Sequence, residues 1–124
     1  MKLSDVIQLE TTLFKIKDKD LPFKVVYQLT KLYKFAEENK QFYTDNLKKI
    51  IDKYSEKDET GNPIALPDND GIKIAPEYIS DAQREINELM VIDIDIPDIK
   101  LDIDKFEDME LNLSDMNCLM PFFN

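Results

Sequence analysis

The strongest constraint on the fold of this chain is a regular apolar seam that runs through residues 20–54. Its positions follow one another in alternating steps of three and four residues, which is the spacing of the a and d positions of a heptad repeat. They are Val26, Leu29, Tyr33, Ala36, Lys40, Tyr43, Leu47, Ile50 and Tyr54. This spacing predicts one helix over residues 20–55, roughly 50 Å long, with Asp20 as its N-cap and Pro22 in its first turn. A helix of this length has to bury its seam against other segments.

Two shorter segments carry the same spacing and can cover the seam. Residues 4–17 predict a helix capped by Ser4, and residues 76–90 predict a helix with a capping box at Ser80 and Gln83. Their apolar positions are Val6, Leu9, Leu13 and Ile16, and Ile79, Ala82, Ile86 and Leu89. Because the first connection is short, we expect the first helix to lie antiparallel to the N-terminal half of the long helix, and the third to return along its C-terminal half. Self-association through the same stripe, giving a homo-oligomer, is the alternative.

The remaining segments predict short strands and a terminal helix. Residues 58–75 contain two turn sequences and predict a turn with a hairpin. Residues 91–103 alternate apolar and acidic side chains, and the alternation changes parity at Pro97, which predicts a bulged strand or two strands at a sheet edge. Residues 113–123 predict a short helix capped by Ser114, followed by an apolar tail.

Together these segments predict a single α+β domain over residues 1–124. A long central helix is packed by two shorter helices in heptad fashion. A small antiparallel sheet forms from residues 64–74 and 91–103, and a short helix closes the chain.

The composition excludes most catalytic and metal-binding devices. The chain has no His, one Cys and two Gly, so it cannot hold a Ser-His-Asp triad, a four-cysteine zinc site or a glycine-rich phosphate loop. Cys118 has no base to activate it. Asp68 and Asp70 suggest a calcium loop, but Leu66 stands where its first ligand would be, which favours a tight turn. We therefore expect no enzyme, no catalytic residue, no cofactor and no metal.

The charge is unevenly distributed along the chain. The net charge is −10, with 12 Lys against 9 acidic residues over 1–57 and 4 basic against 17 acidic residues over 58–124. Phosphate backbones and anionic membranes repel such a chain, so we expect a protein partner with a basic surface and neither direct nucleic-acid binding nor membrane binding. The N-terminal residues lack the apolar stretch of a signal peptide, which predicts a protein that is not secreted by that route.

Two sets of residues are candidates for contact with a partner. The acidic set lies in and after the predicted strands, where alternate positions about 6.8 Å apart form a line of negative charge. Its members are Asp93, Asp95, Asp98, Asp102 and Asp104. The aromatic set lies off the helical seam and in the terminal tail. Its members are Phe35, Phe42, Phe122 and Phe123. The alternatives are a solvated outer sheet face for the acids and core positions for the aromatics.

The order of elements also resembles small proteins of unknown function that tailed bacteriophages encode. The residues behind the resemblance are 21–24 (LPFK), 54–63 (YSEKDETGNP), 85–89 (EINEL) and 92–94 (IDI), within about 20–100. The resemblance implies a phage genome and a role in the virion, in assembly or in managing the host. It carries no catalytic residue over, and it implies a location in the host cytoplasm or in the virion.

Two functional hypotheses follow from the sequence. The first is a non-enzymatic protein-interaction or assembly component, with association with the virion as one option. The second is an acidic inhibitor that occupies the nucleic-acid site of a host enzyme by charge mimicry. Salt separates them, because contacts between exposed charges weaken with salt and apolar contacts do not.

Overall fold

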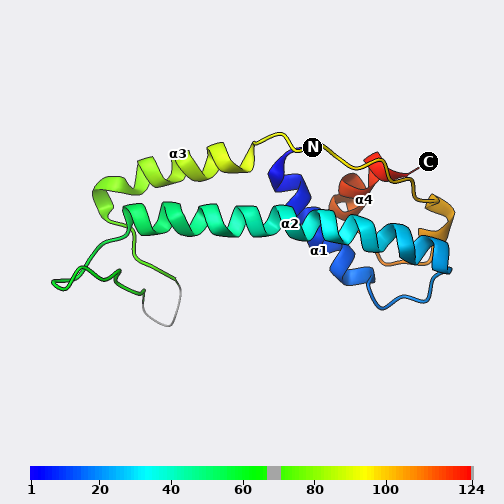
Figure 1. Cartoon of the computed structure of the whole chain (residues 1–124), viewed down its shortest axis with the longest axis horizontal. Helices are drawn as coiled ribbons and strands as arrows, with labels where there is room; N and C mark the ends of the chain where they lie inside the picture. The colour runs from blue at the N-terminus through cyan, green and yellow to red at the C-terminus, as the bar shows by residue number, and fades with distance from the viewer. Residues whose placement is uncertain (67–70, 124) are drawn as a thin grey trace. The chain divides into compact units, whose positions relative to one another are not determined.

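The computed structural model describes residues 1–66 and 71–123 and is helical (Figure 1). Its elements are α1 (Leu3–Ile16), α2 (Phe23–Tyr54), η2 (Pro76–Tyr78), α3 (Ile79–Met90), η3 (Ile103–Phe106), α4 (Leu113–Leu119) and η4 (Met120–Phe122), where η marks a short 3-10 helix. The helical character predicted from the sequence is confirmed. Among the described residues, no helix has the length and apolar composition needed to cross a membrane.

The chain divides into two compact units. Unit 1 comprises Met1–Gln41 and the described part of Asp93–Asn124, and unit 2 is Phe42–Ile92. Helix α2 contributes its N-terminal part to unit 1 and its C-terminal part to unit 2. Each unit therefore has to stabilise itself with its own set of apolar side chains.

The predicted α+β class is wrong, because the described residues contain no strand. In the expected hairpin, residues 64–74, a single antiparallel bridge joins Ala65 and Ile72, and residues 68–70 of its expected turn lie outside the described residues. Further single bridges in this region join Ser55 to Ile74 and Lys57 to Pro63. Isolated bridges of this kind order a connection between two helices without building a sheet.

Residues 91–103 form an extended strap in place of the predicted strand. The Ile94 N–H donates to the Met1 carbonyl at 2.7 Å, and the Leu101 N–H donates to the Phe122 carbonyl at 2.6 Å. Pro97 has no N–H to offer a neighbouring strand. After Pro97 the apolar side chains fall on odd residue numbers, and Ile99 and Leu101 are buried in the core of unit 1. The strap is therefore held by side-chain burial and by single hydrogen bonds.

Helix α1 provides the central apolar face of unit 1. Five of its apolar residues are buried, at the spacing that the sequence predicted: Leu3, Val6, Leu9, Leu13 and Ile16. Its N-terminus differs from the prediction, because the helix begins one residue before Ser4. The Lys2 N–H instead donates to Asp5 Oδ2 at 3.1 Å, which places a carboxylate at the positive end of the helix dipole.

Helix α2 begins at Phe23, immediately after Pro22. The Pro22 carbonyl accepts from the N–H groups of Val25 and Val26 at 2.9 and 3.0 Å, so the helix starts later than the predicted cap at Asp20. Its buried positions in unit 1 are Leu32 and Ala36, whereas Val26 of the predicted seam is 41% exposed. Figure 1 shows that α1 crosses α2 obliquely. A crossing buries a local cluster of side chains, in contrast to the long regular seam of a coiled coil.

The core of unit 1 draws on every segment of the unit. Its buried residues are Val6, Leu9, Leu13, Ile16, Leu32, Ala36, Ile99, Leu101, Phe106, Cys118, Leu119 and Phe122. The terminal segment closes this core, because Phe122 is fully buried and the rings of Phe123 and Phe106 meet edge to face at 5.4 Å.

Unit 2 pairs the C-terminal part of α2 with α3 and has a much smaller core. Among its described residues, the buried apolar side chains are Tyr54, Ala75, Ala82 and Leu89. No side-chain hydrogen bond caps α3, so the capping box predicted at Ser80 does not form. The Gln83 side chain donates instead to Asn87 Oδ1 at 3.1 Å.

The two ends of α4 supply a matched test of the unit 1 core. Leu119 is fully buried and Leu113 is 83% exposed. We predict that Leu119→Ala lowers the free energy of unfolding by about 3 kcal/mol, because it removes buried methyl groups and leaves a cavity. The control Leu113→Ala should change it by less than about 0.5 kcal/mol. Chemical denaturation measures both, and equal losses would contradict this core.

Candidate interaction surfaces

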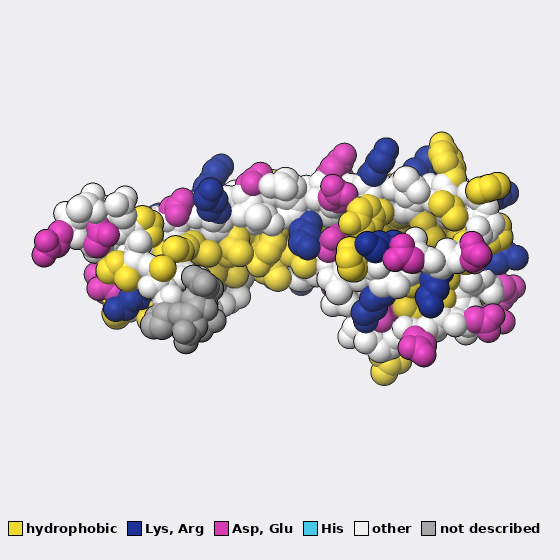
Figure 2. All heavy atoms as spheres, turned by 90° about the horizontal axis from the view of Figure 1, so that it is seen from below, with side chains coloured by type: hydrophobic (Ala, Val, Ile, Leu, Met, Phe, Trp, Pro, Cys, Tyr) yellow, Lys and Arg dark blue, Asp and Glu magenta, His cyan; other side chains and the backbone are white. Residues whose placement is uncertain are grey.

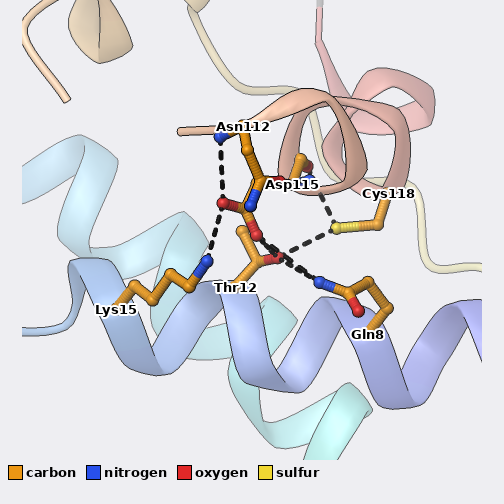
Figure 3. A network of polar contacts seen from close by, with 6 residues as sticks. All are labelled: Gln8, Thr12, Lys15, Asn112, Asp115 and Cys118. Atoms are coloured by element: carbon orange, nitrogen blue, oxygen red, sulfur yellow. Dashed lines mark hydrogen bonds and ion pairs between the residues drawn. The ribbon is translucent and has the colours of Figure 1, made fainter. Parts of the chain in front are cut away.

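The carboxylate of Asp115 is fully buried between α1 and α4 and is held by several hydrogen bonds (Figure 3). Its Oδ1 accepts from Thr12 Oγ1 at 2.6 Å and from Gln8 Nε2 at 3.5 Å. Its Oδ2 accepts from Lys15 Nζ at 3.0 Å and from the Asn112 N–H at 3.1 Å. Four donors from two helices therefore enclose a single charge.

This arrangement holds Asp115 in the ionised form. Desolvation by burial raises the pKa of the carboxyl, but the hydrogen bonds from Thr12 and Lys15, the Asn112 N–H and the charge of Lys15 outweigh it. The net result is a pKa lowered from the ordinary aspartate value. A carboxylate with both oxygens occupied in this way has no free lone pair for a substrate, so the network joins α1 to α4 and offers no catalytic base.

Cys118 lies beside this network and is no better placed for chemistry. Its Sγ is 3.3 Å from Thr12 Oγ1 and 3.1 Å from the main-chain oxygen of Asp115. Burial raises the pKa of the thiol, and the charge of Asp115 adds to the increase. The thiol therefore stays protonated near neutral pH and packs as a small hydrophobe.

Sequence reasoning missed this cluster, although its signal was present. We predicted Ser114 as the cap of the terminal helix, but the cap is Asn112, whose Oδ1 accepts from the Asp115 N–H at 2.9 Å. Residues 112–115 read Asn-Leu-Ser-Asp, which is a reciprocal capping pattern at the correct spacing. The contacts to Thr12 and Lys15 span about a hundred residues of sequence, and no local pattern predicts them.

The structure places all members of the predicted acidic set at the surface of unit 1. Asp93, Asp95 and Asp98 lie on the extended strap, and Asp102 and Asp104 lie at the start of η3. The Asp102 side chain accepts from the Asp104 N–H at 3.0 Å. The acids therefore lie along one segment with their side chains exposed.

The structure does not bring the predicted aromatic set together. Phe122 is fully buried and Phe42 is 45% exposed, whereas Phe35 and Phe123 are partly buried and pack against the core cluster. Phe42 is consequently the one member of this set with a large exposed area.

A half-open apolar cleft lies where the end of α1 meets the start of α2 in unit 1. It encloses about 280 Å³. Its lining residues include Leu13, Ile16, Leu21, Val26, Leu29 and Tyr33, with Lys17 and Lys19. The Lys17 ammonium also lies 4.0 Å from the centre of the Phe14 ring. This cleft is apolar at its base and basic at its side.

An ion pair joins α2 to α3 in unit 2, where Lys53 Nζ lies 3.2 Å from Glu85 Oε1. The hydrogen bond from the Tyr54 side chain is the main cause that lowers the pKa of Glu85, and the hydrogen bond from Lys53 lowers it further. The Lys53 ammonium is also 4.9 Å from the centre of the Tyr54 ring.

Two runs of apolar residues in unit 2 are incompletely buried. With about 100° of rotation per residue, residues that follow one another by four, seven or eleven positions share a side of a helix. Tyr43, Leu47 and Ile51 therefore share one side of α2 with the buried Tyr54, and Ile79, Ile86 and Met90 share one side of α3. We call these six residues the apolar edge.

The apolar edge is only partly covered. Ile79 is 57% exposed, and the other five residues are half-buried. Figure 2 shows hydrophobic side chains in a stripe over the C-terminal half of α2. Tyr43 and Leu47 also belong to the seam that the sequence predicted, for which self-association was the alternative to burial within the chain.

No protein-family model, no curated protein and no solved structure matches the chain. Within residues 1–66 and 71–123, no group of three or more cysteine or acidic side chains is placed to hold a metal ion. The candidate surfaces are therefore interpreted from their own chemistry.

Asp115→Asn tests whether the buried network stabilises unit 1. The amide has one accepting oxygen, so its NH₂ group faces either Lys15 Nζ and the Asn112 N–H, or the Thr12 hydroxyl and Gln8 Nε2, and donors on that side lose their acceptor. We predict a loss of about 2 kcal/mol in the free energy of unfolding at pH 7. The control Asp18→Asn changes an exposed carboxylate and should have little effect. Similar losses in the two variants would show that the network is unimportant.

The wild type and Asp115→Asn should also differ in how their stability depends on pH. The pKa of Asp115 is lowered in the folded state, so its contribution is complete above the ordinary aspartate pKa. That contribution is lost as the pH falls through the folded-state pKa. We expect the free energy of unfolding of the wild type to fall more steeply than that of Asp115→Asn between about pH 5 and pH 3. Denaturation at several pH values measures this, and parallel profiles would contradict the lowered pKa.

Proposed function

We propose that this protein is a non-enzymatic protein-interaction or assembly component. The observation that carries the proposal is the incomplete core of unit 2. A 51-residue unit with four buried apolar side chains among its described residues is small for independent stability, and units of this size usually need a staple or a partner.

The exposed surface of unit 2 supports the same proposal. Beyond the apolar edge, Phe42, Tyr78, Val91 and Ile92 are each between 39% and 54% exposed. Completing the burial of a large apolar side chain stabilises by about 1–2 kcal/mol. A partner that covers even part of this surface therefore gains affinity from apolar contact, which salt does not weaken.

Unit 1 plays a different part in this proposal. Its core is well filled, and its strap presents Asp93, Asp95 and Asp98 to solvent. These carboxylates suit a second contact with a basic protein surface. Such a contact influences the orientation of the two proteins and their association rate more than it influences their affinity. The resemblance to small phage proteins, kept as a hypothesis, would place this role in a virion or in an assembly intermediate.

An acidic inhibitor remains the second candidate function, and one observation favours it. The five predicted acids are all exposed along one segment, and hydrogen bonds of Ile94 and Leu101 tie that segment to unit 1. A line of charge held in this way can compete with a nucleic-acid backbone for a basic cleft.

Affinity capture with matched variants separates the two functions. The tagged chain is used as bait in extracts of the organism that encodes it, and the beads are washed at low and at high salt. We predict that the main partner survives high salt, is lost from Ile79→Glu and is kept by the double variant Asp93→Asn with Asp95→Asn.

The inhibitor hypothesis predicts the reverse pattern. Its partner would be a nucleic-acid enzyme recovered only at low salt, lost from the double Asp variant and kept by Ile79→Glu. That result would replace the interaction-component proposal. Circular dichroism confirms in each case that the variants are folded.

A further inference from the structure

We propose that the apolar cleft of unit 1 binds a small amphipathic acid, which means a free carboxylic acid with a short apolar chain. The apolar chain of the ligand would lie on the base of the cleft, and its carboxylate would lie at the side that Lys17 and Lys19 line. This inference goes beyond the proposed function, which uses the apolar edge of unit 2 and the acidic strap.

The base of the cleft comes from both helices and from the connection between them. Leu13 and Ile16 of α1 are buried, whereas Leu21 of the connection and Leu29 and Tyr33 of α2 are half-buried. Half-buried apolar side chains keep part of their area in contact with water. An apolar ligand gains affinity by removing that area from water.

The size of the cleft favours a small ligand over a docked protein segment. Its volume of about 280 Å³ lies at the lower end of the range for small-molecule sites, roughly 300–1,000 Å³. An amphipathic helix that docks in a groove places apolar side chains over two or more turns, so it needs a longer groove. One short hydrocarbon chain matches this volume better.

The charge at the cleft selects an anion. Within the described part of the chain, the lining contains Lys17 and Lys19 and no acidic side chain, although the whole chain has 26 acidic residues against 16 basic ones. Asp18 and Asp20 belong to the same connection and are exposed, but they are not among the lining residues. The charge of the lining is therefore opposite to that of the chain.

These two lysines are not neutralised by ion pairs. Within residues 1–66 and 71–123, the ion pairs involve Lys15, Lys40, Lys53, Lys73 and Arg84 and neither lysine of the cleft. The Lys17 ammonium lies 4.0 Å from the centre of the Phe14 ring, and such a contact orients a cation without removing its charge. Both ammonium groups are therefore available to a carboxylate.

The helix dipoles do not decide the sign of the potential at the cleft. Helix α1 ends at Ile16 and α2 begins at Phe23, so the negative end of one dipole and the positive end of the other lie in the same region and oppose each other. The lysine side chains therefore set the potential that an anionic ligand meets.

Three ligands with the same linear alkyl chain test the proposal on the full-length protein. Octanoate is an anion, octanol is neutral and octyltrimethylammonium is a cation. We expect octanoate to bind with a dissociation constant of about 1 mM, octanol about fivefold more weakly, and the cation more weakly still. The order is informative because the net charge of −10 by itself favours the cation. Titrations followed by nuclear magnetic resonance measure all three affinities.

Lys17→Gln combined with Lys19→Gln tests the role of the two charges. Both residues are exposed, so the variant should fold. We expect octanoate to bind about fivefold more weakly and octanol to bind as before. The control Lys48→Gln combined with Lys49→Gln makes the same change in net charge at exposed lysines of unit 2, and it should keep the preference for octanoate. Added salt should weaken the binding of octanoate and not that of octanol.

Val26→Trp tests the apolar part of the cleft. Val26 lines the cleft and is 41% exposed, so a larger ring at this position covers its opening without entering the core. We expect octanoate and octanol to bind about fivefold more weakly or worse. The control Tyr27→Trp changes a neighbour that is 60% exposed and is not among the lining residues, and it should bind as the wild type does. Circular dichroism checks that both variants are folded.

The same titrations show where the ligand binds. The methyl signals of Leu13, Ile16 and Leu29 should shift on addition of octanoate, whereas those of Leu47 and Leu89 in unit 2 should not. Larger shifts in unit 2 than in unit 1 would place the ligand on another apolar surface and overturn the inference.

Four further results would overturn the proposed ligand class. They are no binding of octanoate, equal affinity for the three ligands, tighter binding of the cation, and a Lys17 and Lys19 variant that binds octanoate as the wild type does. Binding to phosphatidylglycerol vesicles in a flotation assay, without any shift caused by octanoate, would assign the surface to a membrane and would also overturn it. The proposed function is tested separately, because these measurements do not involve a captured protein or Ile79.

Discussion

The structure depends on the unequal covering of one long helix. Helix α2 has 32 residues, and within residues 1–66 and 71–123 its N-terminal part packs into a larger buried cluster than its C-terminal part. Around its N-terminal part, α1, α4 and the strap enclose Leu32 and Ala36 in a filled core. Around its C-terminal part, α3 leaves one side of the helix partly open. Since burial of apolar area is the main favourable contribution to folding, the two units should differ in stability in the same order.

A buried charge is what joins the two ends of the chain within unit 1. The Asp115 carboxylate caps the first turn of α4 through the Asn112 N–H and accepts hydrogen bonds from Thr12 and Lys15 of α1. A buried charge costs several kcal/mol unless it is fully paired, and here every oxygen has partners. The main effect of the network is therefore to fix the position of α4 along α1. Its net contribution to stability is smaller. Helix α4 is only seven residues long and would not be stable without such contacts.

Charge and apolar surface are separated in this protein, which bears on how it can associate. The acids of the strap lie on unit 1, and the six residues of the apolar edge lie on unit 2. Because the two surfaces are separate, a basic protein can bind the acidic strap and an apolar partner can bind unit 2. Salt weakens the first kind of contact and does not weaken the second.

The sequence by itself determined the helices, because the spacing of apolar residues specifies which positions share a face whatever lies opposite. Val6, Leu9, Leu13 and Ile16 were predicted to be a buried face and are buried. The acids at 93–104 were predicted to be a charged surface, and they are exposed. Helix ends were predicted less well, since capping depends on one hydrogen bond that several neighbouring residues can make. Asn112 is the cap where Ser114 was expected, and α1 begins ahead of Ser4.

Only the tertiary structure decided what the periodic segments pack against. The alternation over 91–103 matches a strand, but Pro97 interrupts it and the core of unit 1 takes Ile99 and Leu101, so no sheet forms among the described residues. The predicted seam of α2 is likewise split, since an oblique crossing buries Leu32 and leaves Val26 exposed. The partners of Asp115 and the partial burial of the apolar edge of unit 2 also depend on contacts between distant residues. Periodicity describes a face of one element, whereas a fold depends on which faces meet, and local sequence does not contain that information.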